Sequence, residues 1–319
     1  MPEPANVKHI ALIGTGLVGA SWAIVFARAG LRVAAYDANA ANTAAAAAFV
    51  DKGLSALDAD GLLAMPREAA LHNIIWQDSA EDALTDADYV QESVGEQLVL
   101  KREVFSMLDR VAPAGAILAS STSTFPVSEF AAELPGRGRC VVAHPVNPPH
   151  LIPFVEVCGA PFTSAATIER TMQVMRLVGQ SPMRVRQEID GFVLNRLQWT
   201  LLAEAVRLIA DGVATPEDID RAIRDGLGRR WALMGPLEVG DLNAPGGVGD
   251  YLTRFGPAIE RIATSRGASQ LPLDARLIDE LARFGRTAWP ASMRTVSDQR
   301  RERFLLALQK LLQDFERDP

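Results

Sequence analysis

The first half of the chain alternates short apolar segments with longer stretches of helical periodicity. The short segments contain β-branched residues or end at turn-forming residues, which is typical of buried strands. They predict strands at Val7–Ile13, Leu31–Tyr36, Ile74–Trp76, Asp88–Gln91, Ala116–Ala119, Cys140–Ala143 and Phe154–Val157. Between them, helical spacing predicts helices at Leu17–Ala29, from Ala40 onward, and at Leu98–Val111, Val127–Glu133 and Thr163–Leu177. This alternation indicates a mostly parallel sheet with helices on both faces.

The pattern changes after Pro182–Arg186. Residues Gly191–Asp211 are apolar around most of a helical circumference, so we expect a helix buried in its own domain or against a second subunit. Thr215 and Pro216 mark another helix start. Further helices are predicted at Val248–Ala263, Asp274–Phe284 and Arg300–Phe315, and no strand is predicted here. We therefore expect an α/β domain at residues 1–188 and an all-helical domain at residues 189–319.

Composition narrows the class of protein. The 319 residues carry 32 basic and 39 acidic side chains, a formal net charge of −7. Because phosphate binding needs clustered Lys and Arg, this acidic chain is not expected to bind nucleic acid. No apolar run reaches about 18 residues, so no membrane span is expected. Cys140 and Cys158 are too few for a disulfide scaffold, and no metal-ligand spacing occurs. We expect a cytoplasmic protein without a metal site.

A GxGxxG motif, Gly14-Thr15-Gly16-Leu17-Val18-Gly19, follows the first predicted strand and opens the first predicted helix. There, glycines let a pyrophosphate approach the backbone, and the N–H groups of the helix start hold its phosphates. Asp37 ends the second strand, where a carboxylate can accept hydrogen bonds from an adenosine ribose. Ala38 and Asn39 offer no cation for a 2′-phosphate, which favours NAD over NADP. This interpretation predicts a Rossmann-type, doubly wound domain. The alternative is a structural turn beside a solvated Asp37.

A second group of residues suggests acid–base chemistry. His144 follows one predicted strand, and Glu156 lies on the next, beyond a proline-rich loop that can bring the two side by side. A carboxylate partner would fix the imidazole tautomer and stabilise the imidazolium. The alternative is an unrelated salt bridge. Ser123 would complete a hydrolytic triad by composition, but it lacks a nucleophile elbow, so a serine that hydrogen-bonds substrate is favoured. We expect His9, His72 and His150 to be structural or solvated.

These residues together resemble the 3-hydroxyacyl-CoA dehydrogenase family. The resemblance covers nearly the whole chain and is carried by the glycine motif, His144–Pro148, Glu156 and Gly191–Leu197. Within that family, Gly179–Val185 and Gly226–Glu238 are most similar to the lambda-crystallin and L-gulonate 3-dehydrogenase branch. The resemblance implies an NAD-dependent dehydrogenase with a Rossmann domain, a helical C-terminal domain and a homodimer formed through the helices.

The resemblance also implies roles for individual residues. His144 would be the general base and Glu156 its partner, while Ser123 and Asn195 would hydrogen-bond the reacting substrate. Glu96 and Lys101 match positions that contact the nicotinamide ribose; the alternative is an ordinary solvated helix start. The cofactor site would then comprise Gly14, Gly16, Leu17, Val18, Gly19, Asp37, Glu96 and Lys101. Pro145 and Val146 replace aromatic residues of the main branch, and His150 replaces an aromatic residue common in the closer branch, which weakens any transfer of substrate specificity.

Charge in one segment bears on the substrate. The stretch Ala40–Asn73 has Lys52 and Arg67 as its cations, whereas the main branch of the family has a Lys-rich excursion there that suits coenzyme A. This favours a small free acid over a CoA ester. A free carboxylate needs a donor, and Arg230 is the candidate because guanidinium binds carboxylate in a bidentate manner. The alternative for Arg230 is a salt bridge at a helix end or a dimer contact.

The favoured function is therefore NAD-dependent oxidation of a small anionic 3-hydroxy acid, such as L-gulonate, to the 3-keto acid. Within the family, the alternatives are a short-chain 3-hydroxyacyl-CoA dehydrogenase and a carnitine 3-dehydrogenase. A second class is the 6-phosphogluconate-like β-hydroxyacid dehydrogenases, which use a catalytic lysine where this chain has Asn195 and Arg196. A third is a non-catalytic NAD-binding or structural protein.

Overall fold

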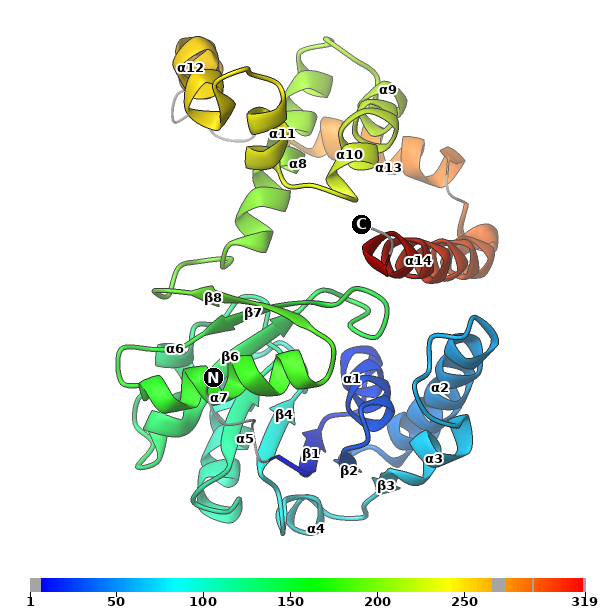
Figure 1. The fold of residues 1–319 in the computed structure, drawn as a ribbon, viewed down its shortest axis with the longest axis vertical. Coiled ribbons are helices and arrows are strands. Elements are labelled where there is room, and N and C mark those ends of the chain that lie inside the picture. The colour runs from blue at the N-terminus through cyan, green and yellow to red at the C-terminus, as the bar shows by residue number, and fades with distance from the viewer. Residues whose placement is uncertain (1–6, 266–273, 289, 318–319) are drawn as a thin grey trace. The chain divides into compact units, whose positions relative to one another are not determined.

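An eight-stranded sheet organises the first part of the chain in the computed structural model, which describes residues 7–265, 274–288 and 290–317 (Figure 1). The strand order is β3-β2-β1-β4-β5-β6-β7-β8. All neighbours are parallel except β6 and β7. The strands are β1 His9–Ile13, β2 Arg32–Tyr36, β3 Ile74–Trp76, β4 Tyr89–Glu92, β5 Ile117–Ser120, β6 Cys140–Pro145, β7 Phe154–Cys158 and β8 Ser181–Val185. The predicted mostly parallel α/β fold is confirmed.

Helices cover both faces of this sheet, and the alternation of side chains along the strands creates two separate cores. In β1, Ile10 and Leu12 belong to one buried cluster, which α1, α2 and α7 complete. Ala11 and Ile13 belong to the other, which α4, α5 and α6 complete. The helices are α1 Leu17–Arg28, α2 Ala40–Ala59, α3 Arg67–His72, α4 Ala80–Leu84, α5 Leu98–Val111, α6 Val127–Ala131 and α7 Ala165–Leu177, with a 3₁₀ turn η1 at Arg137–Arg139. Burial on both faces explains the continuous apolar strands.

Three elements of this unit were not predicted from the sequence. The short helices α3 and α4 lie in segments that periodicity left unassigned. The strand β8 contains Pro182 and Arg184, which are unusual in a strand interior. It tolerates them because it is an edge strand that pairs with β7 alone, so one side needs no ladder hydrogen bonds.

After β8, the regular elements of the described residues are all helical, as predicted. One compact unit contains the described residues up to Leu197 together with those from Arg301 onward, and the other runs from Gln198 to Arg300. The elements are α8 Leu194–Ala210, α9 Pro216–Arg221, the π-helical η2 Ala222–Leu227, α10 Gly228–Trp231, α11 Pro236–Leu242, α12 Gly247–Ser265, α13 Ala275–Ala288, the 3₁₀ turn η3 Ala291–Met293 and α14 Arg294–Arg317.

Two side chains of α14 attach its described residues from Arg301 onward to the rest of the first unit. Leu306 is 4% exposed and packs in the core that α1 and α2 share, and Glu302 pairs with Lys52 of α2 at 3.2 Å. Apolar periodicity predicted this helix but not its partner. The predicted domain boundary at residues 188/189 stays a prediction.

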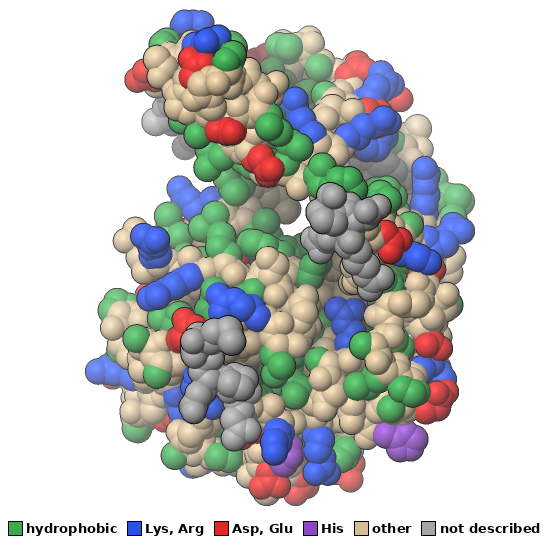
Figure 2. Space-filling model, in the orientation of Figure 1, with side chains coloured by type: hydrophobic (Ala, Val, Ile, Leu, Met, Phe, Trp, Pro, Cys, Tyr) green, Lys and Arg blue, Asp and Glu red, His purple; other side chains and the backbone are tan. Residues whose placement is uncertain are grey.

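Charge is mixed on the visible surface, where Lys and Arg side chains lie interspersed with Asp and Glu (Figure 2). Among the helices that the structure describes, none combines the length and hydropathy needed to cross a membrane. Within the same residues, no cluster of three or more His, Cys, Asp or Glu side chains has the arrangement of a metal site.

Candidate active site

The order of the strands places two loops side by side at the carboxyl edge of the sheet. Chain order reverses between β1 and β4, and ligands of open α/β sheets bind at such a switch point. The loop after β1 begins with Gly14, whose φ is +92°. A Cβ on Gly14 would lie 2.7 Å from the carbonyl carbon of Ser93, which follows β4. Glycine is therefore needed here both for its backbone conformation and for the close approach of the second loop.

The remaining glycines of the motif form the turn that opens α1. A Cβ on Gly19 would lie 2.0 Å from the carbonyl oxygen of Gly14, so the helix can seat against the turn only with glycine at this position. Gly16 has no atom within 4 Å of its Cβ position, and it precedes α1 without a side-chain cap. Uncapped N–H groups beside open space at the positive end of a helix are suited to bind a phosphate.

Asp37 lies at the end of β2, beside this turn. Its Oδ2 accepts hydrogen bonds from the Thr15 N–H and hydroxyl, at 2.7 and 3.3 Å. Its Oδ1 accepts from the Asn39 N–H at 2.9 Å and the Asn42 amide at 3.1 Å. Gly14, Gly16 and Asp37 together line a cavity of about 330 Å³. A carboxylate in this position can accept hydrogen bonds from the hydroxyls of a ribose, as a bound dinucleotide requires.

A second cavity of about 310 Å³ adjoins the first, because both are lined by Ser93 and Val94. It brings together five residues that the sequence analysis identified. Val18 lies on α1, Glu96 in the loop after β4, Lys101 on α5, Ser123 in the loop after β5 and His144 on β6. Leu17 is 54% exposed at the start of α1 and lines a separate hollow with Gly16 and Phe49.

His144 and Glu156 face each other directly across β6 and β7, the antiparallel pair. His144 Nδ1 lies 2.9 Å from Glu156 Oε2. The other carboxylate oxygen accepts the N–H groups of Val193 and Leu194, at 2.8 and 2.9 Å, where α8 begins. Glu156 is fully buried and His144 is 7% exposed. Because a carboxylate accepts, we assign the proton to Nδ1, which leaves Nε2 as the basic nitrogen.

Asn195 and Ser123 are brought together, but through the backbone of the serine. The Asn195 side-chain amide donates to the Ser123 carbonyl oxygen at 3.0 Å, which ties the start of α8 to the loop after β5. Phe192, with φ of +49°, packs its ring 5.8 Å from that of His144. The Ser123 hydroxyl itself is directed to Glu96 at 3.4 Å.

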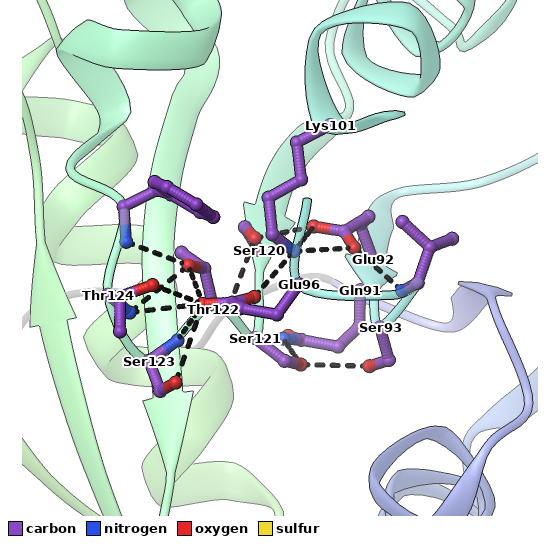
Figure 3. A network of polar contacts seen from close by, with 12 residues as sticks. Gln91, Glu92, Ser93, Glu96, Lys101, Ser120, Ser121, Thr122, Ser123 and Thr124 are labelled. Atoms are coloured by element: carbon purple, nitrogen blue, oxygen red, sulfur yellow. Dashed lines mark hydrogen bonds and ion pairs between the residues drawn. The ribbon is translucent and has the colours of Figure 1, made fainter. Parts of the chain in front are cut away.

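An ion-pair network supports the second cavity (Figure 3). The Lys101 ammonium lies 3.1 Å from Glu92 Oε1 and 3.2 Å from Glu96 Oε2. Glu92 is fully buried, and this burial raises its pKa although Lys101 acts in the opposite direction. For Glu96, burial acts to raise the pKa, but hydrogen bonds from Thr122 and the charge of Lys101 outweigh it and lower the pKa. Glu96 Oε1 also accepts from Ser123 and Thr124, so it anchors the whole loop.

Sequence reasoning missed Glu92 and the polar residues beside it. The signal that could have found them is the run Gln91-Glu92-Ser93 at the end of an otherwise apolar strand, since polar residues that end a parallel strand face the ligand edge. Arg230, the predicted carboxylate donor, lies on α10 in the second unit, where it is exposed. Its role stays a prediction.

The reversal at β1/β4, the glycine turn and Asp37 define a dinucleotide-binding α/β protein. Two family models match: the NAD binding domain of 3-hydroxyacyl-CoA dehydrogenase over residues 9–189 and its C-terminal domain over residues 191–286. The chain belongs to the 3-hydroxyacyl-CoA dehydrogenase family. It is therefore an NAD-dependent dehydrogenase of a family that acts on the CH–OH group of 3-hydroxy acids or 3-hydroxyacyl groups.

Individual relatives show how similar the chain is to known proteins. It is 43% identical to a lambda-crystallin homolog of Bos taurus over 268 residues, 83% of each chain. It is 37% identical to an L-carnitine dehydrogenase of Streptomyces griseus, covering 84% of this chain and 79% of the relative. Among solved structures, the chain resembles 5-formyl-3-hydroxy-2-methylpyridine 4-carboxylic acid 5-dehydrogenase, which is described as an NAD⁺-dependent dismutase. The TM-score is 0.84 at 28% sequence identity, and the match covers 96% of this chain and 99% of that one.

The buried carboxylate of Glu156 generates a stability prediction. In Glu156→Gln, an amide NH₂ would have to face either His144 Nδ1–H or the two N–H groups of α8. Either one set of donors would lose its acceptor, or the imidazole proton would have to move to Nε2 so that Nδ1 accepts the amide. In both cases the charge-assisted hydrogen bonds of the carboxylate are lost, so we expect the free energy of unfolding to fall by about 1–3 kcal/mol. Urea denaturation measures this. Glu169→Gln, at a half-exposed position on α7, is the matched control and should change stability by less than about 0.5 kcal/mol. Equal stabilities of the two variants would contradict the assignment.

Proposed function

We propose that this protein oxidises a small anionic 3-hydroxy acid to the 3-keto acid with NAD, and that His144 is the general base. The observation that carries the proposal is the His144–Glu156 pair, with Nε2 of His144 left basic in a cavity that also holds Lys101, Glu96 and Ser123. When bound, NAD supplies the acceptor for the hydride that leaves carbon 3.

Side chains of the protein account for the removal of the hydroxyl proton. His144 Nε2 takes the hydroxyl proton as the C–H bond gives up its hydride, so the O–H electron pair becomes the second bond of the new carbonyl. Glu156 stabilises the imidazolium that forms. Ser123 and Asn195 hold the reacting oxygen, and Asn195 reaches this place through its hydrogen bond to the Ser123 carbonyl. General-base catalysis contributes roughly 10²–10⁴-fold.

The cofactor contacts follow from the two cavities. We propose that Asp37 binds the adenosine ribose and that the turn of Gly14, Gly16 and Gly19, with Leu17 and Val18 at the start of α1, holds the pyrophosphate. Glu96 and Lys101 would contact the nicotinamide ribose, and they already lie together beside His144.

Substituting the histidine tests the mechanism. We expect His144→Ala to lower kcat by about 10²–10⁴-fold, the range of general-base catalysis, while the dissociation constant for NAD⁺ changes less than about threefold. NADH absorbance measures turnover and calorimetry measures cofactor binding. His72→Ala, at an exposed histidine whose Nδ1 contacts the backbone of Glu68, is the control and should behave as the unmodified protein. Full turnover by His144→Ala would remove this residue from the mechanism.

Charge favours a free acid, with L-gulonate as the proposed substrate. Lys52 and Arg67, the cations in Ala40–Asn73, are already paired with carboxylates: Lys52 with Glu302, and Arg67 with Asp51 and Glu68. By contrast, no hydrogen bond or ion pair engages the Arg230 guanidinium within the part of the chain that the structure describes. We propose Arg230 as the group that captures the substrate carboxylate.

Two measurements test the substrate. NADH formation is compared with L-gulonate, L-carnitine, 3-hydroxybutyrate and 3-hydroxybutyryl-CoA, and we expect the highest kcat/KM with L-gulonate. Arg230→Ala should raise KM for the free acid by about 10–100-fold, the worth of a charged hydrogen bond. Arg229→Ala is the control, because Arg229 pairs with Asp225 at 3.9 Å. Activity confined to the thioester would overturn the free-acid proposal. A highest kcat/KM with L-carnitine would overturn L-gulonate as the substrate and favour carnitine oxidation instead.

We also propose that the protein forms a homodimer through its helical unit. On α12, Leu252, Phe255, Ile259 and Ile262 recur at spacings that place them on one face, and each is 46–66% exposed. A continuous apolar stripe of this kind on a helix is typical of a surface that another helix covers.

The stripe predicts the effect of a single charge. We expect Ile259→Arg to shift the protein from dimer to monomer in sedimentation velocity, because the charge would have to be desolvated at the contact. Arg261→Glu, on the opposite face of the same helix, changes charge without touching the stripe and should leave the dimer intact. A monomeric unmodified protein, or a dimer that persists in Ile259→Arg, would contradict the proposed interface.

A further inference from the structure

The hydroxyl of Ser93 lies where the two cavities meet. Ser93 follows β4 and, with Val94, lines both the cavity of Asp37 and the cavity of His144. Its oxygen lies 2.9 Å from the hydroxyl oxygen of Ser121, which follows β5 (Figure 3). Distance alone does not say which of these two hydroxyls donates, but their neighbours decide it.

Ser121 receives hydrogen bonds from two groups that can only donate. Trp22 Nε1–H lies 3.1 Å from Ser121 Oγ. Gln91 Nε2 lies 2.7 Å from the same oxygen and 3.3 Å from the carbonyl oxygen of Ala143. Since a carbonyl oxygen only accepts, the Gln91 atom beside it is the nitrogen, and the amide orientation is fixed. A hydroxyl accepts two hydrogen bonds and donates one, so the proton of Ser121 is directed to Ser93.

This direction leaves the proton of Ser93 free for another acceptor. Ser93 Oγ accepts from Ser121, and among the described residues Ser121 is its one hydrogen-bond partner. The chain of donors begins deeper in the core, where the Tyr89 hydroxyl lies 2.9 Å from Gln91 Oε1. Successive hydrogen bonds of this kind polarise one another and strengthen the last donor. Ser93 is therefore an oriented donor whose acceptor is supplied by a ligand.

We propose that Ser93 donates a hydrogen bond to an oxygen of bound NAD, in the segment that joins the pyrophosphate to the nicotinamide ribose. The inference rests on the proposed placement of the cofactor across both cavities. A dinucleotide with its adenosine beside Asp37 and its nicotinamide beside His144 passes Ser93 and Val94, the residues that the cavities share. Phosphate and ribose oxygens are the acceptors in that segment.

Fragments of the cofactor locate the contact. In Ser93→Ala, we expect the dissociation constants of NAD⁺ and of ADP-ribose, measured by calorimetry, to rise about three- to tenfold, the effect of one hydrogen bond. AMP, which fills the Asp37 cavity alone, should bind as before. Ser93→Cys should show the same loss, because a thiol keeps the size of the side chain but is a weak donor. Ser106→Ala, which removes an exposed hydroxyl from α5, is the control.

The outcomes separate this proposal from the proposed function. Unchanged affinity for NAD⁺ and ADP-ribose in Ser93→Ala would overturn it, as would an equal loss for AMP. Unchanged NAD⁺ affinity with a raised KM for the hydroxy acid would also overturn it, since the donor would then serve the substrate. Asp37→Ala tests the placement independently: if AMP binding is not weakened there, the placement itself fails. The His144→Ala result bears on the mechanism alone and leaves the Ser93 contact unaffected.

Discussion

The carboxylate of Glu156 is the group on which the geometry of the candidate site depends. A fully buried carboxylate is stable only when donors replace its lost water, and Glu156 has three: His144 Nδ1 and the N–H groups of Val193 and Leu194. One acidic side chain therefore orients the imidazole with one oxygen and fixes the start of α8 with the other. Asn195, in the first turn of that helix, is placed by the same interaction.

The antiparallel pairing of β7 with β6 makes this contact possible. Strands β1 to β6 run parallel to one another, whereas β7 and β8 run in the opposite direction, and residues directly opposite in the β6–β7 pair share a face. His144 pairs with Glu156 in this register, so a slip of one residue would turn the carboxylate to the other face of the sheet. Pro145 ends β6, and the loop to β7 contains Pro148, Pro149 and Pro153, whose fixed φ angles restrict the unfolded loop and favour one return path.

The sequence predicts the parts of the structure that periodicity and turn chemistry determine. The β1–turn–α1 unit and the His144–Glu156 pair could be predicted because each follows from local spacing. The strand β8 could not, because Pro182 and Arg184 are unusual in a strand interior and its edge position tolerates them. The polar end of β4 marks Glu92 as a candidate, but its pairing with Lys101 could not be predicted, since Lys101 comes from a different element and buried ion pairs leave no periodic trace.

The contact of Leu306 with the core that α1 and α2 share could not be predicted from the sequence either. An apolar position on a helix indicates that something covers it, not what. The same holds for the orientation of the Ser121 and Ser93 hydroxyls, which depends on Trp22 and Gln91 from two other elements. Local patterns thus predicted the elements and the nearest pairs, whereas contacts between distant elements required the fold.

Charge along the two cavities explains why a dinucleotide suits them better than a mononucleotide. One cavity presents the carboxylate of Asp37, and the other presents Glu96, whose partner Lys101 also pairs with the buried Glu92. Between these carboxylates lies the uncapped start of α1 at Gly16, where the helix dipole is positive. Acidic groups accept ribose hydroxyls and repel phosphate, while the helix start attracts phosphate. A carboxylate in each cavity can therefore accept the hydroxyls of one ribose, and the positive start of α1 between them can hold the pyrophosphate that joins the two riboses.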